Sequence, residues 1–465
     1  MKKLLSLFVV IVLLLSLTLS SCDFSSVPFL ENILPGDNGD EDMTTETLMN
    51  KISDAMDAVS SLEMNTEIDA LYYVSGKKIT FQLTSKLLYI ADGEETYFYN
   101  EGEVALSGAG VEQELSTIEA YNDGKYFLSY AQDGLVKKLC SENTEKEFMD
   151  LYDNVSEKSV YDDYGKASHI KNSDGTYTVT LTEYDEDFID STNEDLGLPM
   201  ENGGGRVVGC TATLTVNADY TIKKTDIDYV FSNTDFSGSQ TVDFKSYNTV
   251  KKITNTINPD DYTEVSDAIG ITLYQTLLSK RTNSESGSFT FSLNQTVSLG
   301  ASSSVHNEKD IVSYGVDDDG YYFDLEAEIN GTEHTITYGD GVYKVDGEAD
   351  DSQDYNDVIA KSFIDGLIDP FGVTPIEIED VTVLRKGNKK VYTFELYPHS
   401  GNVYEAVASL FNQVRVIYRD AEMQLKVSVE NYEIVELEYI IHAVGGTGMN
   451  QMHFDIEART EFTDD

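Results

Sequence analysis

Apolar and polar residues alternate along several segments of the chain. Examples are Phe289–Asn294, Met423–Val429, Val435–Ile441 and Met452–Glu457. In each segment one set of alternate side chains is apolar and most of the other set is polar. A strand that packs one face and leaves the other in water has this period of two. The pattern therefore predicts antiparallel β-sheet.

Other segments place apolar residues at the spacing of a helix face. The predicted helices cover about 45–62, 144–155, 258–277, 355–367 and 403–414, with a weaker one at 188–198. Thr144 and Glu147 have the spacing of a capping box. Asn258 can cap the third helix, with Pro259 at its first position. Pro370 is expected to end the fourth.

Short stretches of the first half recur, in the same order, in the second half. Residues 121–126 resemble 338–343, and residues 175–181 resemble 390–396. Further on, the spacing of apolar residues at 227–244 resembles that at 437–454. Such collinear matches indicate internal repeats. We therefore predict an α+β fold with two tandem repeats, at 45–255 and 258–465. Each repeat is a curved antiparallel sheet, half-barrel-like, with helices packed on one face.

The N-terminus has the pattern of an export signal. Lys2 and Lys3 precede an apolar run from Leu4 to Leu19, which is shorter than the ~20 residues that span a bilayer. The sequence Leu19-Ser20-Ser21-Cys22 resembles the bacterial lipobox. That resemblance implies a signal peptide at 1–21, acylation of Cys22 (palmitate-type chains) and anchorage on the extracytoplasmic side of the membrane. Residues 22–44 are then expected to be a flexible acidic tether.

The composition restricts the partners. The chain has 465 residues with 83 Asp+Glu and 32 Lys+Arg, a formal charge of -51. This charge argues against nucleic acid as a partner, because binding nucleic acid requires a basic surface. With 40% apolar residues the chain is too hydrophobic for wholesale disorder.

The order of elements is similar to that of LolA/LolB and LppX/LprG-type half-barrel proteins. The turns Asp123-Gly124-Lys125-Tyr126 and Asp340-Gly341-Val342-Tyr343 also resemble those of such sheets. The resemblance implies a curved sheet closed by helices around an apolar cavity, with a lipid-like ligand. The leading hypothesis is therefore a non-enzymatic, membrane-anchored surface lipoprotein that binds an apolar or lipid-like ligand or a protein partner. The ligand would then contact inner-face residues, which we expect to be Leu214, Val216, Ile227, Tyr229 and Phe244 in the first repeat and Phe289, Phe291, Leu293, Leu437, Tyr439 and Phe454 in the second.

A second hypothesis makes all these residues ordinary core. The protein would then be a structural or interaction module of the cell envelope, with solid cores, no ligand, and an acidic outer face that contacts other proteins. A hydrolase with an unrecognised site is a third hypothesis. None of the catalytic, phosphate-binding or zinc motifs that we sought is present, and the six histidines are scattered. We therefore predict no catalytic residue, metal or cofactor.

Three further features are interpreted as ordinary structure rather than as functional sites. The acidic runs Asp317–Asp319 and Asp185–Asp187, with Asp190, are interpreted as solvated turns rather than Ca²⁺ sites. Cys140 and Cys210 are predicted to be buried or half-buried thiols, with a disulfide as the alternative. The 30 tyrosines suit half-buried strands, where the ring packs and the hydroxyl meets water.

Overall fold

The structure is a computed structural model. It describes residues 43–74, 77–91, 96–108, 111–155, 160–161, 164–186, 188–189, 192–193, 206–233, 235–250, 253, 257–317, 320–349, 355–398, 401–412 and 416–463. The predicted signal peptide, Cys22 and the tether up to residue 42 lie outside these residues. So do Asp187, Asp190, Asp318 and Asp319 of the acidic runs, and most of the weak helix at 188–198. The chain divides into two compact units at Thr263–Glu264.

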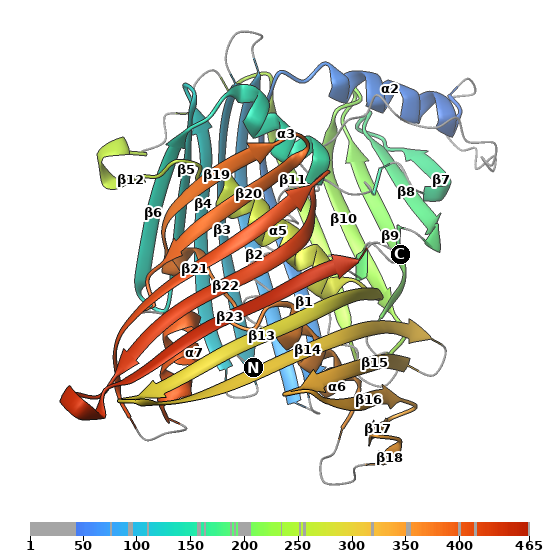
Figure 1. Cartoon of the computed structure of the whole chain (residues 1–465). Helices are drawn as coiled ribbons and strands as arrows, with labels where there is room; N and C mark the ends of the chain where they lie inside the picture. Colours follow the sequence, from blue (N-terminus) through green and yellow to red (C-terminus); the bar gives the residue numbers. More distant parts are fainter. Residues whose placement is uncertain are drawn as a thin grey trace. The chain divides into compact units, whose positions relative to one another are not determined.

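The first unit is built on an antiparallel sheet of twelve described strands (Figure 1). Its elements are α2 (Thr45–Asp57), β1 (Ser61–Val74), β2 (Lys77–Ala91), β3 (Thr96–Gly108), β4 (Val111–Asn122), β5 (Lys125–Gln132), β6 (Leu135–Glu142), α3 (Glu145–Val155), β7 (Tyr164–Lys171), β8 (Tyr177–Tyr184), β9 (Val207–Val216), β10 (Ile222–Phe231), β11 (Ser237–Tyr247), η2 (Pro259–Asp261) and β12 (Thr263–Glu264).

The second unit is built on an antiparallel sheet of eleven described strands. Its elements are α5 (Ile269–Asn283), β13 (Gly287–Leu299), β14 (Ser302–Asp317), β15 (Gly320–Ile329), β16 (Thr332–Gly339), β17 (Val342–Val345), β18 (Glu348–Ala349), α6 (Asp357–Ile368), η3 (Pro375–Glu377), β19 (Ile378–Lys386), β20 (Lys389–Leu396), α7 (Gly401–Asn412), β21 (Tyr418–Glu430), β22 (Glu433–Gly445), η4 (Gly448–Asn450) and β23 (Met452–Thr463).

The strands follow the same order in both sheets. The first sheet runs from β6 to β1 and then from β11 to β7, with β12 added beside β6. The second runs from β18 to β13 and then from β23 to β19. In each sheet the first strand of the unit therefore pairs with the last long one, β1 with β11 and β13 with β23. A helix, α3 or α6, connects the two halves.

Most predicted elements lie where their pattern placed them. The four alternating segments are in β13, β21, β22 and β23. The capping box of α3 is formed, because the Glu147 amide donates to Thr144 Oγ1 (3.2 Å) and the Thr144 amide donates to Glu147 Oε2 (3.0 Å). Phe148 of this helix stacks on Tyr121 of β4, with ring centroids 4.6 Å apart. The predicted helix at 403–414 is α7.

The predicted helix at 258–277 was wrong at its start. Pro259–Asp261 forms one 3-10 turn, and Asn258 makes no side-chain capping bond there. The chain then extends into β12, and α5 begins only at Ile269. Tertiary packing explains the difference, because the Tyr262 side chain is held against the first sheet by Phe127.

Two other helix boundaries also need correction. The helix predicted at 45–62 ends at Asp57, and Leu62 belongs to β1. Tyr355 precedes α6 and stacks on Tyr343, with centroids 4.0 Å apart. In both cases an apolar residue outside the helix has the spacing of the buried helix face. Leu62 lies in β1, and Tyr355 lies before α6.

Helix α5 occupies the core of the second unit. Nearly all of its side chains are buried, so it lacks the polar face of a surface helix. Tyr274 lies 5.2 Å from Phe394 of β20 between ring centroids, and Gln275 Nε2 donates to the Val373 carbonyl (2.9 Å). The hydrogen bond satisfies a buried amide, which would otherwise be costly.

An apolar cluster lies at one end of the first sheet. It consists of Leu88, Tyr99, Ala120, Phe127 and Cys140, which are buried. Three residues of the segment after β11 pack on it: Ile253, Ile257 and Tyr262. The described parts of this segment, residue 253 and residues 257–262, are called the strap below. Their apolar side chains cover the apolar cluster.

The two cysteines are confirmed as thiols, because Cys140 and Cys210 are both buried and form no disulfide. Burial raises the pKa of the Cys210 thiol to about 12. The tyrosines follow the expectation only in part. Tyr99 and Tyr321 are buried rather than half-buried, and Tyr322 alternates to the exposed side.

Candidate functional site

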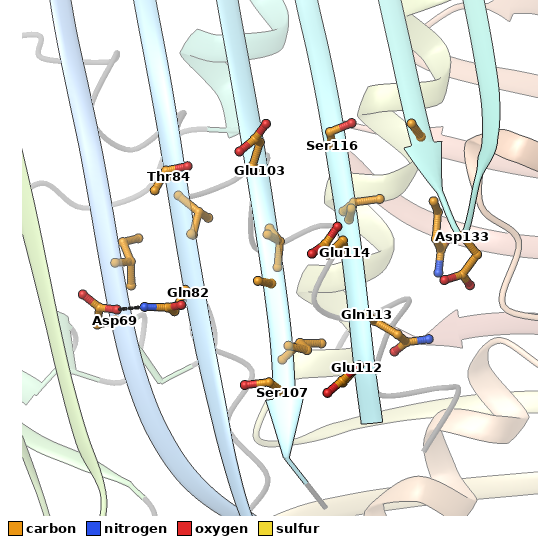
Figure 2. A pocket seen from close by; sticks show the side chains of 18 of the residues that line it. Asp69, Gln82, Thr84, Glu103, Ser107, Glu112, Gln113, Glu114, Ser116 and Asp133 are labelled. Atoms are coloured by element: carbon orange, nitrogen blue, oxygen red, sulfur yellow. Dashed lines mark hydrogen bonds between the residues drawn. The ribbon is translucent and has the colours of Figure 1, made fainter. Parts of the chain in front are cut away.

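A hollow of about 1040 Å³ is lined by residues of strands β1 to β5 and of the turn after β5 (Figure 2). All of its lining residues belong to the first unit. Its polar lining consists of Glu67, Asp69, Gln82, Thr84, Glu103, Ser107, Glu112, Gln113, Glu114, Ser116, Gln132 and Asp133. The volume is at the upper end of the range of small-molecule sites, roughly 300–1,000 Å³.

The strand register places most of the polar lining side chains on one face. Glu67, Thr84, Glu103, Ser116 and Ala131 are successive partners across five strands. The next row on this face contains Asp69, Gln82, Ala105 and Glu114. The intervening residues of the same strands alternate to the opposite face and are buried: Ile68, Leu83, Val104 and Leu115. They belong to the lining as well, so the hollow is lined by exposed polar residues of one face and by buried apolar residues of the other.

Small residues leave room among the longer side chains of these rows. Ala105 lies between Gln82 and Glu114, whereas Ser116 and Ala131 are direct neighbours beside Glu103. Cross-strand neighbours are about 5 Å apart, so these short side chains leave space next to the long ones. Figure 2 shows Glu103, Glu114 and Ser116 spread across the strands, and the Gln82 Nε2 donates to Asp69 Oδ1 (2.8 Å).

The hollow carries six carboxyl groups and no Lys, Arg or His in its lining: Glu67, Asp69, Glu103, Glu112, Glu114 and Asp133. The nearby Lys86 is paired instead with Glu63, at 3.2 Å. Like charges on neighbouring strands repel each other. A cation placed among them removes this repulsion and gains hydrogen bonds to charged acceptors.

The chemistry of the lining limits what it can do. Carboxylates, amides and hydroxyls accept hydrogen bonds, but the lining holds no histidine, cysteine or lysine to activate a nucleophile. Throughout the described part of the chain, no group of three or more His, Cys, Asp or Glu side chains is placed to hold a metal ion. The arrangement suits a ligand with several separated N–H donors.

The sequence-predicted residues of the first unit lie away from this hollow. Leu214, Val216, Ile227 and Phe244 are buried on β9, β10 and β11. Tyr229 is half-buried, and its hydroxyl donates to Gln240 Oε1 (3.0 Å). None of the five lines the hollow.

The predicted residues of the second unit pack against its helices. Phe289, Phe291, Leu437, Tyr439 and Phe454 are buried and Leu293 is half-buried. The Phe454 ring meets that of Phe411 on α7 at 4.6 Å, edge to face. The Tyr439 hydroxyl donates to Asp369 Oδ1 (2.5 Å), just beyond α6. These contacts are those of a core.

Sequence reasoning missed the hollow. The sequence feature that could have indicated the hollow is the recurrence of two acidic residues at alternate positions of a strand, as in Glu67/Asp69, Glu101/Glu103 and Glu112/Glu114. Alternate positions share a strand face. With 83 acids in the chain, however, such pairs arise often, and only the register of five strands shows that these ones gather.

No protein family and no curated protein matches the chain. Among solved structures, a putative outer membrane lipoprotein-sorting protein domain from Vibrio parahaemolyticus is similar at 9% identity and a TM-score of 0.18, over 46% of this chain and 97% of that one. A beta-barrel-like protein of the DUF1849 family from Brucella abortus is similar at 9% identity and a TM-score of 0.17, over 41% of this chain and 100% of that one.

A DUF1329 family protein from Desulfovibrio piger is similar at 10% identity and a TM-score of 0.18, over 44% of this chain and 94% of that one. The structural neighbours thus include lipoprotein-sorting and beta-barrel-like domains. Within the described residues, no helix is both long and apolar enough to cross a bilayer.

Proposed function

We propose that the protein is a non-enzymatic binding protein of the bacterial cell envelope. It binds a hydrophilic, cationic segment of a protein partner in the acidic hollow of its first unit. The observation that supports this proposal is the gathering of six carboxyl groups, with no basic residue, around about 1040 Å³. This proposal corresponds to the hypothesis, raised from the sequence, that the protein is an envelope interaction module that contacts other proteins.

The proposal includes the anchor and the repeat. The lipobox at Leu19–Cys22 supports lipid anchorage on the extracytoplasmic side. The equal strand order of the two sheets, together with the collinear sequence matches, supports two tandem half-barrel-like repeats. Anchorage would hold the acidic hollow near a surface where cationic segments of other envelope proteins are available.

Binding of a short oligolysine peptide to the chain from residue 23 onward tests the hollow. Calorimetry at low and high salt should show binding that weakens with salt, because the contacts are charged and open to solvent. Glu103→Gln with Glu114→Gln should weaken binding about tenfold, since two exposed ion pairs contribute up to about 1 kcal/mol each.

The matched control changes Glu326 and Glu328 to Gln. Both are exposed on β15 in the second unit, and the double variant alters net charge equally. Equal binding by the two double variants would contradict the proposal.

The lipid-ligand hypothesis predicts a different result. Native mass spectrometry would then show copurifying lipid, and the protein would take up a fluorescent fatty acid. The burial of Phe289, Leu437 and Phe454 within the core favours the cationic partner instead.

A further inference from the structure

One hairpin of this acidic chain is basic. The turn between β19 and β20 carries Arg385, Lys386, Lys389 and Lys390 around Gly387 and Asn388. Gly387 has a φ of 63°, a conformation that favours glycine and allows a two-residue turn. Four of the 32 basic residues of the chain are thus gathered at one tip.

The hairpin pairs like charges directly across its strands. Lys386 lies opposite Lys389, and Arg385 lies opposite Lys390. Like charges directly opposite each other destabilise a hairpin. Lys389 lies 3.8 Å from Glu436, and the Lys390 ammonium lies 5.7 Å from the Tyr432 ring. Arg385 and Lys386 are exposed. Four basic residues gathered at one exposed tip of an acidic chain form a surface that a negatively charged partner would recognise.

Apolar residues accompany both charged surfaces. Leu384, next to Arg385, is 67% exposed. Val136 is 61% exposed on β6, where it pairs with Ala131 of the hollow lining. Val136 therefore lies at the edge of the hollow, on the same face as its carboxyl groups. A basic tip with one exposed leucine thus matches an acidic hollow with one exposed valine.

From this match we infer that the hairpin Leu384–Lys390 of one copy docks into the acidic hollow of a second copy. The inference rests on the proposed function and names its cationic segment. The hollow and the hairpin are different surfaces, so the contact is head-to-tail and produces open chains or closed rings. Lipid anchorage on a common membrane would raise the local concentration of copies and favour this contact.

Net charge sets the salt dependence of this assembly. Copies with a formal charge of -51 repel each other when screening is weak. At about 0.15 M salt the screening length is about 8 Å, so the docked opposite charges still attract while the distant like charges are screened. Higher salt weakens the docked pairs as well. Association should therefore be strongest at intermediate salt.

Analytical ultracentrifugation of the chain from residue 23 onward, over a range of concentrations, tests the inference. We expect concentration-dependent association at intermediate salt. Glu103→Lys with Glu114→Lys makes the hollow repel the basic hairpin. Lys386→Glu with Lys389→Glu removes the positive charge of the hairpin that the hollow recognises. Each double variant should raise the dissociation constant about tenfold or more, because it replaces two attractive charge pairs at the contact by repulsive ones.

Mixing the two double variants is the decisive step. The first keeps its hairpin and the second keeps its hollow, so the mixture should form one-to-one dimers that grow no further. Charge reversal at Glu326 and Glu328 should leave the wild-type association unchanged. A mixture that stays monomeric, a wild-type chain that does not associate, or association unaffected by either reversal would overturn the inference. Oligolysine binding in the hollow without self-association would overturn only this inference, whereas loss of both would also overturn the proposed function.

Discussion

Tyr262 packs edge to face against Phe127, with ring centroids 5.2 Å apart and ring planes at 78°. The two residues come from different parts of the first unit, the strap and β5. The Lys138 ammonium lies 5.6 Å from the Tyr262 ring. Burial, and to a smaller extent Asp261, raise the pKa of the Tyr262 hydroxyl. Tyr262 is thus the main ring by which the strap covers the apolar cluster.

Replacing Tyr262 by Ala should destabilise the first unit by about 2 kcal/mol, because the aromatic pair and the burial of the ring are both lost. The change should also expose Cys140, which lies in the same cluster and is 2% exposed. Labelling with a thiol reagent should become faster at Cys140. Cys210 is the internal control, since it lies on β9 outside the cluster. Equal acceleration at both thiols would mean general unfolding rather than release of the strap.

Tyr439→Phe tests whether a residue predicted to bind ligand is instead part of the core. The Tyr439 hydroxyl donates to Asp369 Oδ1, which also accepts from the Gly372 amide (3.0 Å). Removing one oxygen leaves the buried Asp369 short of a donor, at a cost of about 1–3 kcal/mol. Urea unfolding should show this loss. Tyr229→Phe is the matched control, since its hydroxyl is only part-buried and should matter less.

The pattern of the sequence predicted individual strands well, but it did not predict which residues gather around the acidic hollow. Alternation in β13, β21, β22 and β23 is a local property, so the elements followed from it. The acidic hollow depends on which strands are neighbours, as with Glu103 beside Ser116. Helix α5 shows the same limit, because its start at Ile269 depends on where the strap packs. Pairing between distant segments is what a single sequence leaves undetermined.

Gly270→Ala is expected to destabilise the second unit although alanine favours helices. A Cβ at Gly270 would lie 2.6 Å from the ring of Tyr392 on β20, closer than real contacts allow. Alanine gains up to about 1 kcal/mol in helix propensity, but overpacking costs about 1–3 kcal/mol. The net loss should be about 1–2 kcal/mol in a denaturant titration. Combining the change with Tyr392→Leu, which makes room for the methyl group, should recover part of it, and failure to recover any would contradict this account.

Asp310 should make the second unit less stable as the pH rises. Its side chain is 2% exposed on β14, between Phe291 and Ala327 of the neighbouring strands, and its Oδ1 has no hydrogen-bond partner among the described residues. Burial, and then the negative charge of Glu308, raise the pKa of Asp310 to about 7. Glu308 in turn contacts His306, whose Nε2 lies 3.2 Å from Glu308 Oε2.

The sign follows from proton binding. In the unfolded chain an aspartate has a pKa of about 3.9, so between about pH 4 and 7 the folded state binds the proton and the unfolded state does not. Folding stability therefore falls as the pH rises through this window and levels off above it. We expect a loss of about 2 kcal/mol, which lowers the melting temperature by about 5 °C between pH 5 and 8.

Asp310→Asn removes the ionisation, so its melting temperature should fall less over the same pH range. The comparison uses the slope with pH, because the buried amide of the variant has a cost of its own that does not change with pH. Asp324→Asn, at an exposed position on β15, is the control and should retain the wild-type slope. An unchanged slope in Asp310→Asn would show that Asp310 does not hold its proton in the folded state.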